Sequence, residues 1–174
     1  MKRLALFALS FATLVSVHAE EAKFSVSAFS FALPDGWKKV EPKSTMRKAQ
    51  LEIPGQDGGK PGEVTFFFFG GGQGGDVDAN VSRWLGQFSG GKDVQKVEPQ
   101  DINGVKVTLV STEGTMKASP FAGIPEDVPN AALQGAILEH ADGPVFIKMT
   151  GPGPLVKASK EKFMGLVKSA TEKK

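Results

Sequence analysis

The strongest hydrophobic pattern lies between residues 63 and 88, which read EVTFFFFGGGQGGDVDANVSRWLGQF. Residues 63–69 predict a strand that is apolar on both faces, since consecutive phenylalanines place aromatic rings on each side. Such a strand needs cover on both sides. The glycine-rich run 70–75 ends it, and apolar residues at helical spacing over 76–88 predict an amphipathic helix. We expect the remaining strands to be arranged around this strand.

The two ends of that helix carry recognisable signals. Asp76 or Asp78 is placed to cap it, because a carboxylate there accepts from the free N–H groups of the first turn. Ser89, Gly90 and Gly91 are expected to end it.

Alternating apolar positions predict further strands at residues 24–33, 46–53, 94–102, 105–111, 131–139 and 145–150. Asn103-Gly104 and Asp142-Gly143 mark the turns of two hairpins. Residues 155–170 predict a second helix, and residues 112–130, with three prolines, predict a long irregular loop. The chain is therefore expected to form an α+β fold, a mostly antiparallel sheet of about seven strands packed with two main helices.

The first nineteen residues have the features of a secretory signal. Lys2 and Arg3 precede an apolar run over residues 4–17, and Val17-His18-Ala19 offers small residues at a cleavage site. A membrane anchor is the alternative, but the run is shorter than the roughly 20 apolar residues that a span needs. We expect residues 1–19 to be removed, leaving residues 20–174 as a single periplasmic or secreted domain with no stable membrane span.

Removal of the signal changes the charge balance. The whole chain has 21 Lys and Arg against 19 Asp and Glu, but Lys2 and Arg3 leave with the signal, so the mature chain is neutral. This balance argues against a nucleic-acid partner. The absence of cysteine excludes disulfides, thiolate metal sites and cysteine nucleophiles.

The mature chain has little catalytic equipment. His140 is its only histidine, since His18 belongs to the signal, and no GxSxG motif precedes it. His140 lies beside a predicted turn, where an exposed or edge residue is the simpler interpretation. We assign no catalytic residue, metal site or cofactor, and the sequence predicts a protein that is not an enzyme.

Carboxylates offer an alternative. Asp76 and Asp78 at the helix start, and Glu126 and Asp127 in the long loop, could serve as acid and base or bind calcium. Helix capping and a solvated loop explain the same residues. Glu139 and Lys148 are expected to form an ion pair across the second hairpin.

A polar stripe on the central helix could bind a ligand. Asn80, Arg83 and Gln87 lie beside the apolar arc, with Trp84 on the border. These side chains could bind a small polar ligand or another protein. Alternatively they hold the helix against the glycine loop and the neighbouring strand ends.

The segments FALPDGW, MRKAQLEIPG, FFFFGGGQGG, NVSRWLGQF and GAILEHADGPVFIKMTGP resemble uncharacterised exported proteins of planctomycetes and verrucomicrobia. The order of strands and helices is also similar to the fold shared by the PsbP subunit of photosystem II and the Ran-binding Mog protein of yeast. The resemblance implies a PsbP-like sandwich and an accessory or binding module, and it brings no catalytic residues.

We therefore expect an exported, non-enzymatic accessory or binding domain of the cell envelope. The first alternative is a carboxylate-based or calcium-assisted hydrolase. The second is a structural envelope protein that self-associates through the doubly apolar sheet, giving a homodimer.

Overall fold

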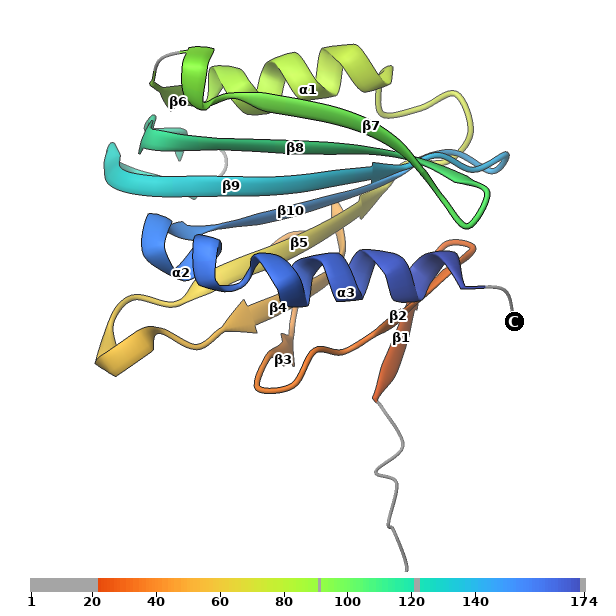
Figure 1. Ribbon diagram of the computed structural model, residues 1–174, viewed down its shortest axis with the longest axis horizontal. Coiled ribbons are helices and arrows are strands. Elements are labelled where there is room, and N and C mark those ends of the chain that lie inside the picture. Colours follow the sequence, from red (N-terminus) through yellow and green to blue (C-terminus); the bar gives the residue numbers. More distant parts are fainter. Residues whose placement is uncertain (1–21, 91, 121–122, 173–174) are drawn as a thin grey trace, which may run out of the picture.

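The computed structural model describes residues 22–90, 92–120 and 123–172. The predicted signal, residues 1–19, lies outside these ranges, and so does Gly91 at the expected end of the central helix. An eight-stranded sheet forms the centre of the described chain, and a two-stranded hairpin and three helices pack against it (Figure 1). The predicted α+β class is confirmed.

The strand order of the main sheet is β3-β4-β5-β10-β9-β8-β6, with β7 also paired to β8, and all pairings are antiparallel. The predicted apolar strand is β5, and it lies between β4 and β10. The bounds are β3 (Lys38–Val40), β4 (Arg47–Ile53), β5 (Gly62–Phe68), β6 (Phe88–Ser89), β7 (Lys96–Ile102), β8 (Val105–Met116), β9 (Val128–Leu138) and β10 (Val145–Pro152).

Two helices and a hairpin cover one face of the sheet, which we call the α3 face. The helices are α2 (Gly153–Ala158) and α3 (Lys160–Thr171), and the hairpin consists of β1 (Lys23–Val26) and β2 (Phe29–Ala32). Phe66 of β5 is fully buried beneath them. The rings of Phe24 and Phe31 meet the Phe66 ring at centroid distances of 5.2 and 5.1 Å. The α3 face holds the larger apolar core.

The hairpin is also bonded to the end of the chain. The backbone N–H of Ala32 donates to the hydroxyl of Ser169 at 2.9 Å, across 137 positions of sequence. The first and last elements of the described chain therefore lie side by side.

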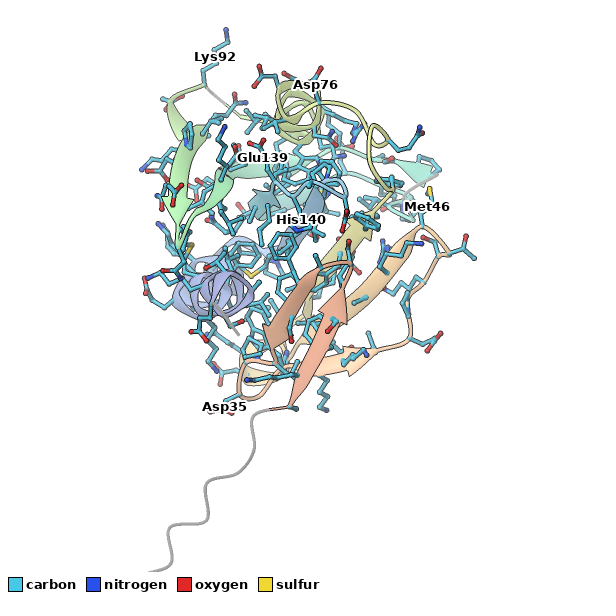
Figure 2. All side chains as sticks on the ribbon, turned by 90° about the vertical axis from the view of Figure 1, so that its right-hand side faces the viewer. Asp35, Met46, Asp76, Lys92, Glu139 and His140 are labelled. Carbon is cyan, nitrogen blue, oxygen red and sulfur yellow. The ribbon has the colours of Figure 1, made fainter. Side chains whose placement is uncertain are left out.

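The opposite face, which we call the α1 face, carries α1 (Val77–Gly86), on the other side of the sheet from α3 (Figures 1 and 2). Val81 and Trp84 are buried against the sheet. Asp76 caps the helix as predicted, accepting from Ala79 N at 2.7 Å. No helix within residues 22–90, 92–120 and 123–172 is long and apolar enough to span a membrane.

The prediction of one strand over residues 24–33 is wrong, because β1 and β2 form a hairpin with its turn at Ser27 and Ala28. Ser27 adopts a φ of 52°, which closes the turn. The buried positions are even-numbered in β1 and odd-numbered in β2, so the turn keeps both sets on one face.

The helix boundaries also differ from the predictions. α1 ends at Gly86, and Phe88–Ser89 form β6 against β8 instead of a last helical turn. The predicted helix over residues 155–170 is divided at Ser159 into α2 and α3. Ser159 N donates to two carbonyls, those of Leu155 and Val156, which tightens the chain at the division.

Residues 112–130 do not form a long loop. β8 continues to Met116 and β9 begins at Val128, so only residues 117–127 connect them. Residues 112–116 and 128–130 have an irregular side-chain pattern, but pairing between β8 and β9 satisfies their backbone hydrogen-bonding groups. Residues 121 and 122 of this connection lie outside the described ranges.

Trp84 packs directly on the backbone of β9 at Gly135. A Cβ at Gly135 would lie 2.5 Å from Cζ3 and 2.8 Å from Cε3 of Trp84. The Trp84 ring also meets the Phe146 ring nearly edge-on, at a centroid distance of 6.5 Å. A side chain at Gly135 would therefore push α1 away from the sheet.

Gly135→Ala is expected to lower the free energy of unfolding by about 1–3 kcal/mol, because the added methyl overpacks the contact with Trp84. Urea denaturation measures this change. Gly165→Ala on α3 is the matched control: its Cβ would meet nothing within 4 Å, and alanine favours a helix. Equal stability of the Gly135 variant and the wild type would contradict the proposed contact.

Candidate functional site

α1 covers only part of its face of the sheet. It packs over β6, β8 and β9 and reaches β10 through Trp84 and Gln87, whereas no described helix packs over β4 and β5 on that face. The side chains that point from this uncovered part are mostly polar. Register places Gln50 opposite Thr65, Thr65 opposite Lys148, and Glu63 opposite Thr150.

A groove of about 1080 Å³ lies over this polar part of the sheet. Its walls are residues 41–46, between β3 and β4, and residues 119–120 and 123–124 between β8 and β9. Figure 2 shows Met46 at the outer edge of the molecule, on the side away from α3. The large apolar side chains of the lining include Met46, Phe67, Met116, Ile124 and Val128. The polar ones include Lys43, Arg47, Gln50, Glu63 and Thr150.

The Glu63 carboxylate organises the polar floor of the groove. Its Oε2 accepts from Gln50 Nε2 at 3.2 Å, Arg47 Nη1 at 3.3 Å and Lys43 Nζ at 3.4 Å. Arg47 Nη1 also donates to Gln50 Oε1 at 2.8 Å, and that oxygen accepts from Lys43 N at 3.1 Å. One carboxylate oxygen therefore accepts from two cations and an amide.

Lys148 lies next to this network and joins it to α1. Its Nζ donates to Gln87 Oε1 at 2.8 Å. Burial lowers the pKa of Lys148 from 10.5 to about 8, Glu63 opposes this shift, and the charges of Arg47 and Arg83 add to it. The amine is therefore more easily neutralised than an exposed lysine, because burial penalises its charged form.

The four side chains of the predicted stripe on α1 differ in their burial, and two of them are buried. Asn80 is buried and donates to the carbonyls of Gly74 and Asp76 at 2.9 and 2.8 Å, so it holds the glycine loop to the helix. Trp84 is buried against the sheet.

Arg83 and Gln87, in contrast, are not fully buried. Arg83 is exposed and donates to Asn80, whereas Gln87 is half-buried and contacts Lys148 beside the groove. The stripe thus combines two buried side chains with two that lie outside the groove lining, of which Gln87 contacts Lys148.

The carboxylate pairs of the alternative hydrolase site, Asp76 with Asp78 and Glu126 with Asp127, lie apart in the structure. Asp76 and Asp78 follow β5, whose last residues lie level with Leu138 at the end of β9. Glu126 and Asp127 precede the start of β9. Asp127 is tied to the C-terminal end of α1, because it accepts from Ala118 N and the neighbouring Lys117 N donates to Gln87 O. Asp76 and Asp78 lie at the N-terminal end of α1, so about the length of that helix, roughly 15 Å, separates the two pairs. In the described part of the chain, no group of three or more His, Asp or Glu side chains could hold a metal ion.

The residues near the second hairpin lie away from the groove. His140 is exposed, as predicted, and its ring meets that of Phe29 edge-on at 5.6 Å. The predicted pair between Glu139 and Lys148 is wrong. The connection between β9 and β10 is longer than the two-residue turn assumed, and Lys148 donates to Gln87 instead.

The sequence analysis missed Arg47, Gln50, Glu63 and Lys148 as site residues. A signal was present in β4, where Gln50 and Glu52 alternate with buried Ala49, Leu51 and Ile53. That alternation indicates a polar face, but alone it looks like ordinary contact with solvent.

Comparisons with known proteins support the fold. No model of a known protein family and no curated protein matches the chain. Its structure is similar to PsbP (CyanoP) of Synechocystis sp. PCC 6803, with 12% identity and a TM-score of 0.54 over 91% of this chain and 96% of that chain. A Pseudomonas aeruginosa protein of unknown function, PA94, aligns over 90% of this chain and 99% of its own, with 11% identity and a TM-score of 0.49.

The similarity to CyanoP confirms the predicted PsbP-like fold and assigns no activity. The resemblance to exported planctomycete and verrucomicrobial proteins stays a prediction.

Asn80→Ala is expected to destabilise the protein by about 1–3 kcal/mol, because the carbonyls that Asn80 satisfies lose a buried donor. Arg83→Ala, which removes an exposed side chain, should change stability by about 0.5 kcal/mol or less. Urea denaturation of both variants checks this. Similar losses from the two would show that Asn80 is not the structural member of the stripe.

Lys148 should make stability depend on pH above neutrality. Its pKa is about 8 in the folded protein and near 10.5 in the unfolded chain, so the unfolded chain binds more protons between these values. Stability should therefore rise from pH 8 to 10.5 through this group. We expect Lys148→Met to lose this rise in urea denaturation, whereas Lys168→Met, on the exposed side of α3, should keep it. A rise that persists in Lys148→Met would contradict the assignment.

Proposed function

We propose that this protein is an exported, non-enzymatic binding domain of the cell envelope and that the groove is its binding site. The observation that carries the proposal is the polar network around Glu63, which lies on the floor of a groove of about 1080 Å³. Binding sites are typically concave, mostly apolar, and provided with a few fixed polar groups. The groove has all of these features.

The chemistry of the groove supports binding over catalysis. Its described lining contains no histidine, and its carboxylates are Glu41, Glu52 and Glu63. The Glu63 oxygen is occupied by three donors, an arrangement that suits a fixed counter-ion. We see no nucleophile–base pair of the kind that acyl-transfer enzymes use within the described lining.

Arg83 and Gln87 of the predicted stripe would influence the proposed site from outside its lining, through Lys148. Gln87 orients Lys148 at the edge of the polar floor, and the charge of Arg83 acts on the same amine. Asn80 and Trp84 support them by fixing α1 on the sheet. The stripe would thus contribute to binding through one edge of the groove.

Export rests on the first nineteen residues of the sequence. Their basic start, apolar run and small residues at positions 17 and 19 are the features of a cleaved secretory signal. We propose that the mature chain begins near Glu20 and acts in the periplasm or outside the cell.

Photo-crosslinking from inside the groove tests the proposed function. A photoreactive amino acid replaces Met46, which lines the groove and is 61% exposed. The variant is made in the cells that normally produce the protein. We expect position 46 to crosslink to one discrete partner or ligand, and the mass of the recovered protein to match a chain that begins near Glu20.

The same amino acid at Val97 is the matched control, because Val97 is 45% exposed on β7 and does not line the groove. Equal crosslinking from both positions, or none from position 46, would contradict the proposed site. Crosslinking of the protein to a second copy of itself would favour the homodimer.

A further inference from the structure

Building on the proposed function, we infer that the groove binds an extended peptide segment of another protein, about six residues long, with an acidic side chain between apolar ones. Arg47 and Lys43 would hold the carboxylate, and the apolar side chains would lie against the walls. The inference names the class of partner for the same site.

The length of the groove determines the length of the segment. Along β5, the lining runs from Gly62 at one end to Phe67 at the other. At about 3.3 Å per residue, this distance is about 17 Å, which an extended segment of five or six residues would match. A longer ligand would leave the groove at either end.

The Arg47 side chain is already held in a position from which it could bind a carboxylate. Its side chain is only 13% exposed, and within the described ranges both of its hydrogen bonds come from Nη1, to Gln50 and Glu63. A guanidinium has further N–H donors at Nε and Nη2, in the planar arrangement that matches a carboxylate. Because the side chain is already held in place, a ligand would lose less conformational freedom on binding it.

Lys43 supplies a second cation that can move. Its side chain is 73% exposed, and its Nζ shares Oε2 of Glu63 with Arg47. An exposed ion pair of this kind contributes little to stability, so its ammonium can turn towards an incoming acid at small cost. Glu63 would remain as the counter-ion beneath the bound carboxylate.

The rim of the groove has mixed charge, which favours a peptide over a uniformly anionic surface. Glu41, Glu52 and Lys60 surround the cationic centre formed by Arg47 and Lys43. An anionic membrane would meet the two rim carboxylates and be repelled. A peptide with one acid between uncharged residues would place its carboxylate at the centre and avoid the rim acids.

The apolar walls would accept the flanking side chains. Phe67 is half-buried on the floor, where its ring stacks with that of Phe69 at a centroid distance of 6.3 Å. Met46 and Met116 both line the groove, Met46 exposed and Met116 buried, and the flexible thioether of Met46 can adapt to side chains of different shape. The groove would therefore select an acidic side chain at its centre and accept apolar side chains of different shape at its walls.

Recovery of peptides from two matched pools tests the inference. Both pools contain acetylated and amidated hexapeptides of Leu, Val, Ile and Phe, so that no terminal charge contributes. One pool has Asp or Glu at the third position, and the other has Asn or Gln there. Peptides bound to the mature protein are identified by mass spectrometry. We expect the acidic pool to be recovered about tenfold better, since a charge-assisted hydrogen bond is worth about that factor.

Variants of the groove show where the acid binds. Arg47→Gln should abolish the preference for the acidic pool. Lys43→Gln, which changes an exposed side chain and should leave folding intact, should reduce it about threefold. Lys168→Gln removes the same charge from the exposed side of α3 and should leave it unchanged. Raising the salt concentration should weaken recovery of the acidic pool only.

Equal recovery of the two pools, or an acid preference that survives in Lys43→Gln and Arg47→Gln alike, would overturn the inference. Displacement of the peptides by dodecanoate at a concentration lower than that of the peptides would also overturn it, since the groove would then bind an amphiphile in preference to a peptide. A partner crosslinked at position 46 together with equal recovery of both pools would retain the proposed function and reject the acidic peptide. Failure of the crosslinking experiment would reject both.

Discussion

The contact between Trp84 and Gly135 determines which part of the sheet remains open. An α-helix is about 10 Å wide, whereas the sheet is seven strand positions wide, since β6 and β7 both pair with the outer side of β8. Seven positions spaced by about 4.8 Å extend over roughly 29 Å. One helix can therefore cover only a few strands, and the absence of a side chain at Gly135 places α1 over β8 and β9. The strands beyond it carry polar side chains on that face, and Gln50, Thr65 and Thr150 among them are buried beneath the walls of the groove and not beneath a helix. The groove is a consequence of where a single helix docks.

Elements with local signals could be predicted from the sequence. Asn103-Gly104 has positive φ angles at both residues and forms the expected turn, and Asp76 caps the expected helix. β5 was identified because its phenylalanines require burial whatever lies next to them. The hairpin of β1 and β2 was missed although the phase of its apolar positions changes at the turn, because Ser27 and Ala28 are not the residues that usually announce one.

The groove could not be predicted because its residues meet only through long-range pairing. Gln50, Thr65 and Lys148 are neighbours because β5 lies between β4 and β10, and no local pattern specifies that order. Taken alone, Glu63 and Lys148 look like ordinary charges on half-buried strands. Their significance lies in the pairing of the strands, which places the Glu63 carboxylate where it accepts from two cations and places the half-buried Lys148 on the neighbouring strand. The sequence analysis reached only the edge of this site, through Gln87 on α1.

The link between Ala32 and Ser169 has a consequence for the time course of folding. The β1–β2 hairpin forms from local pairing, but its aromatic side chains gain a complete environment only when α3 is available, at the far end of the chain. Loop closure over such a separation slows folding, because the chain loses entropy before the contacts that stabilise it are made. The N-terminal hairpin must therefore wait for the last helix, and a chain emerging N-terminus first would stay unfolded until nearly all of it had appeared.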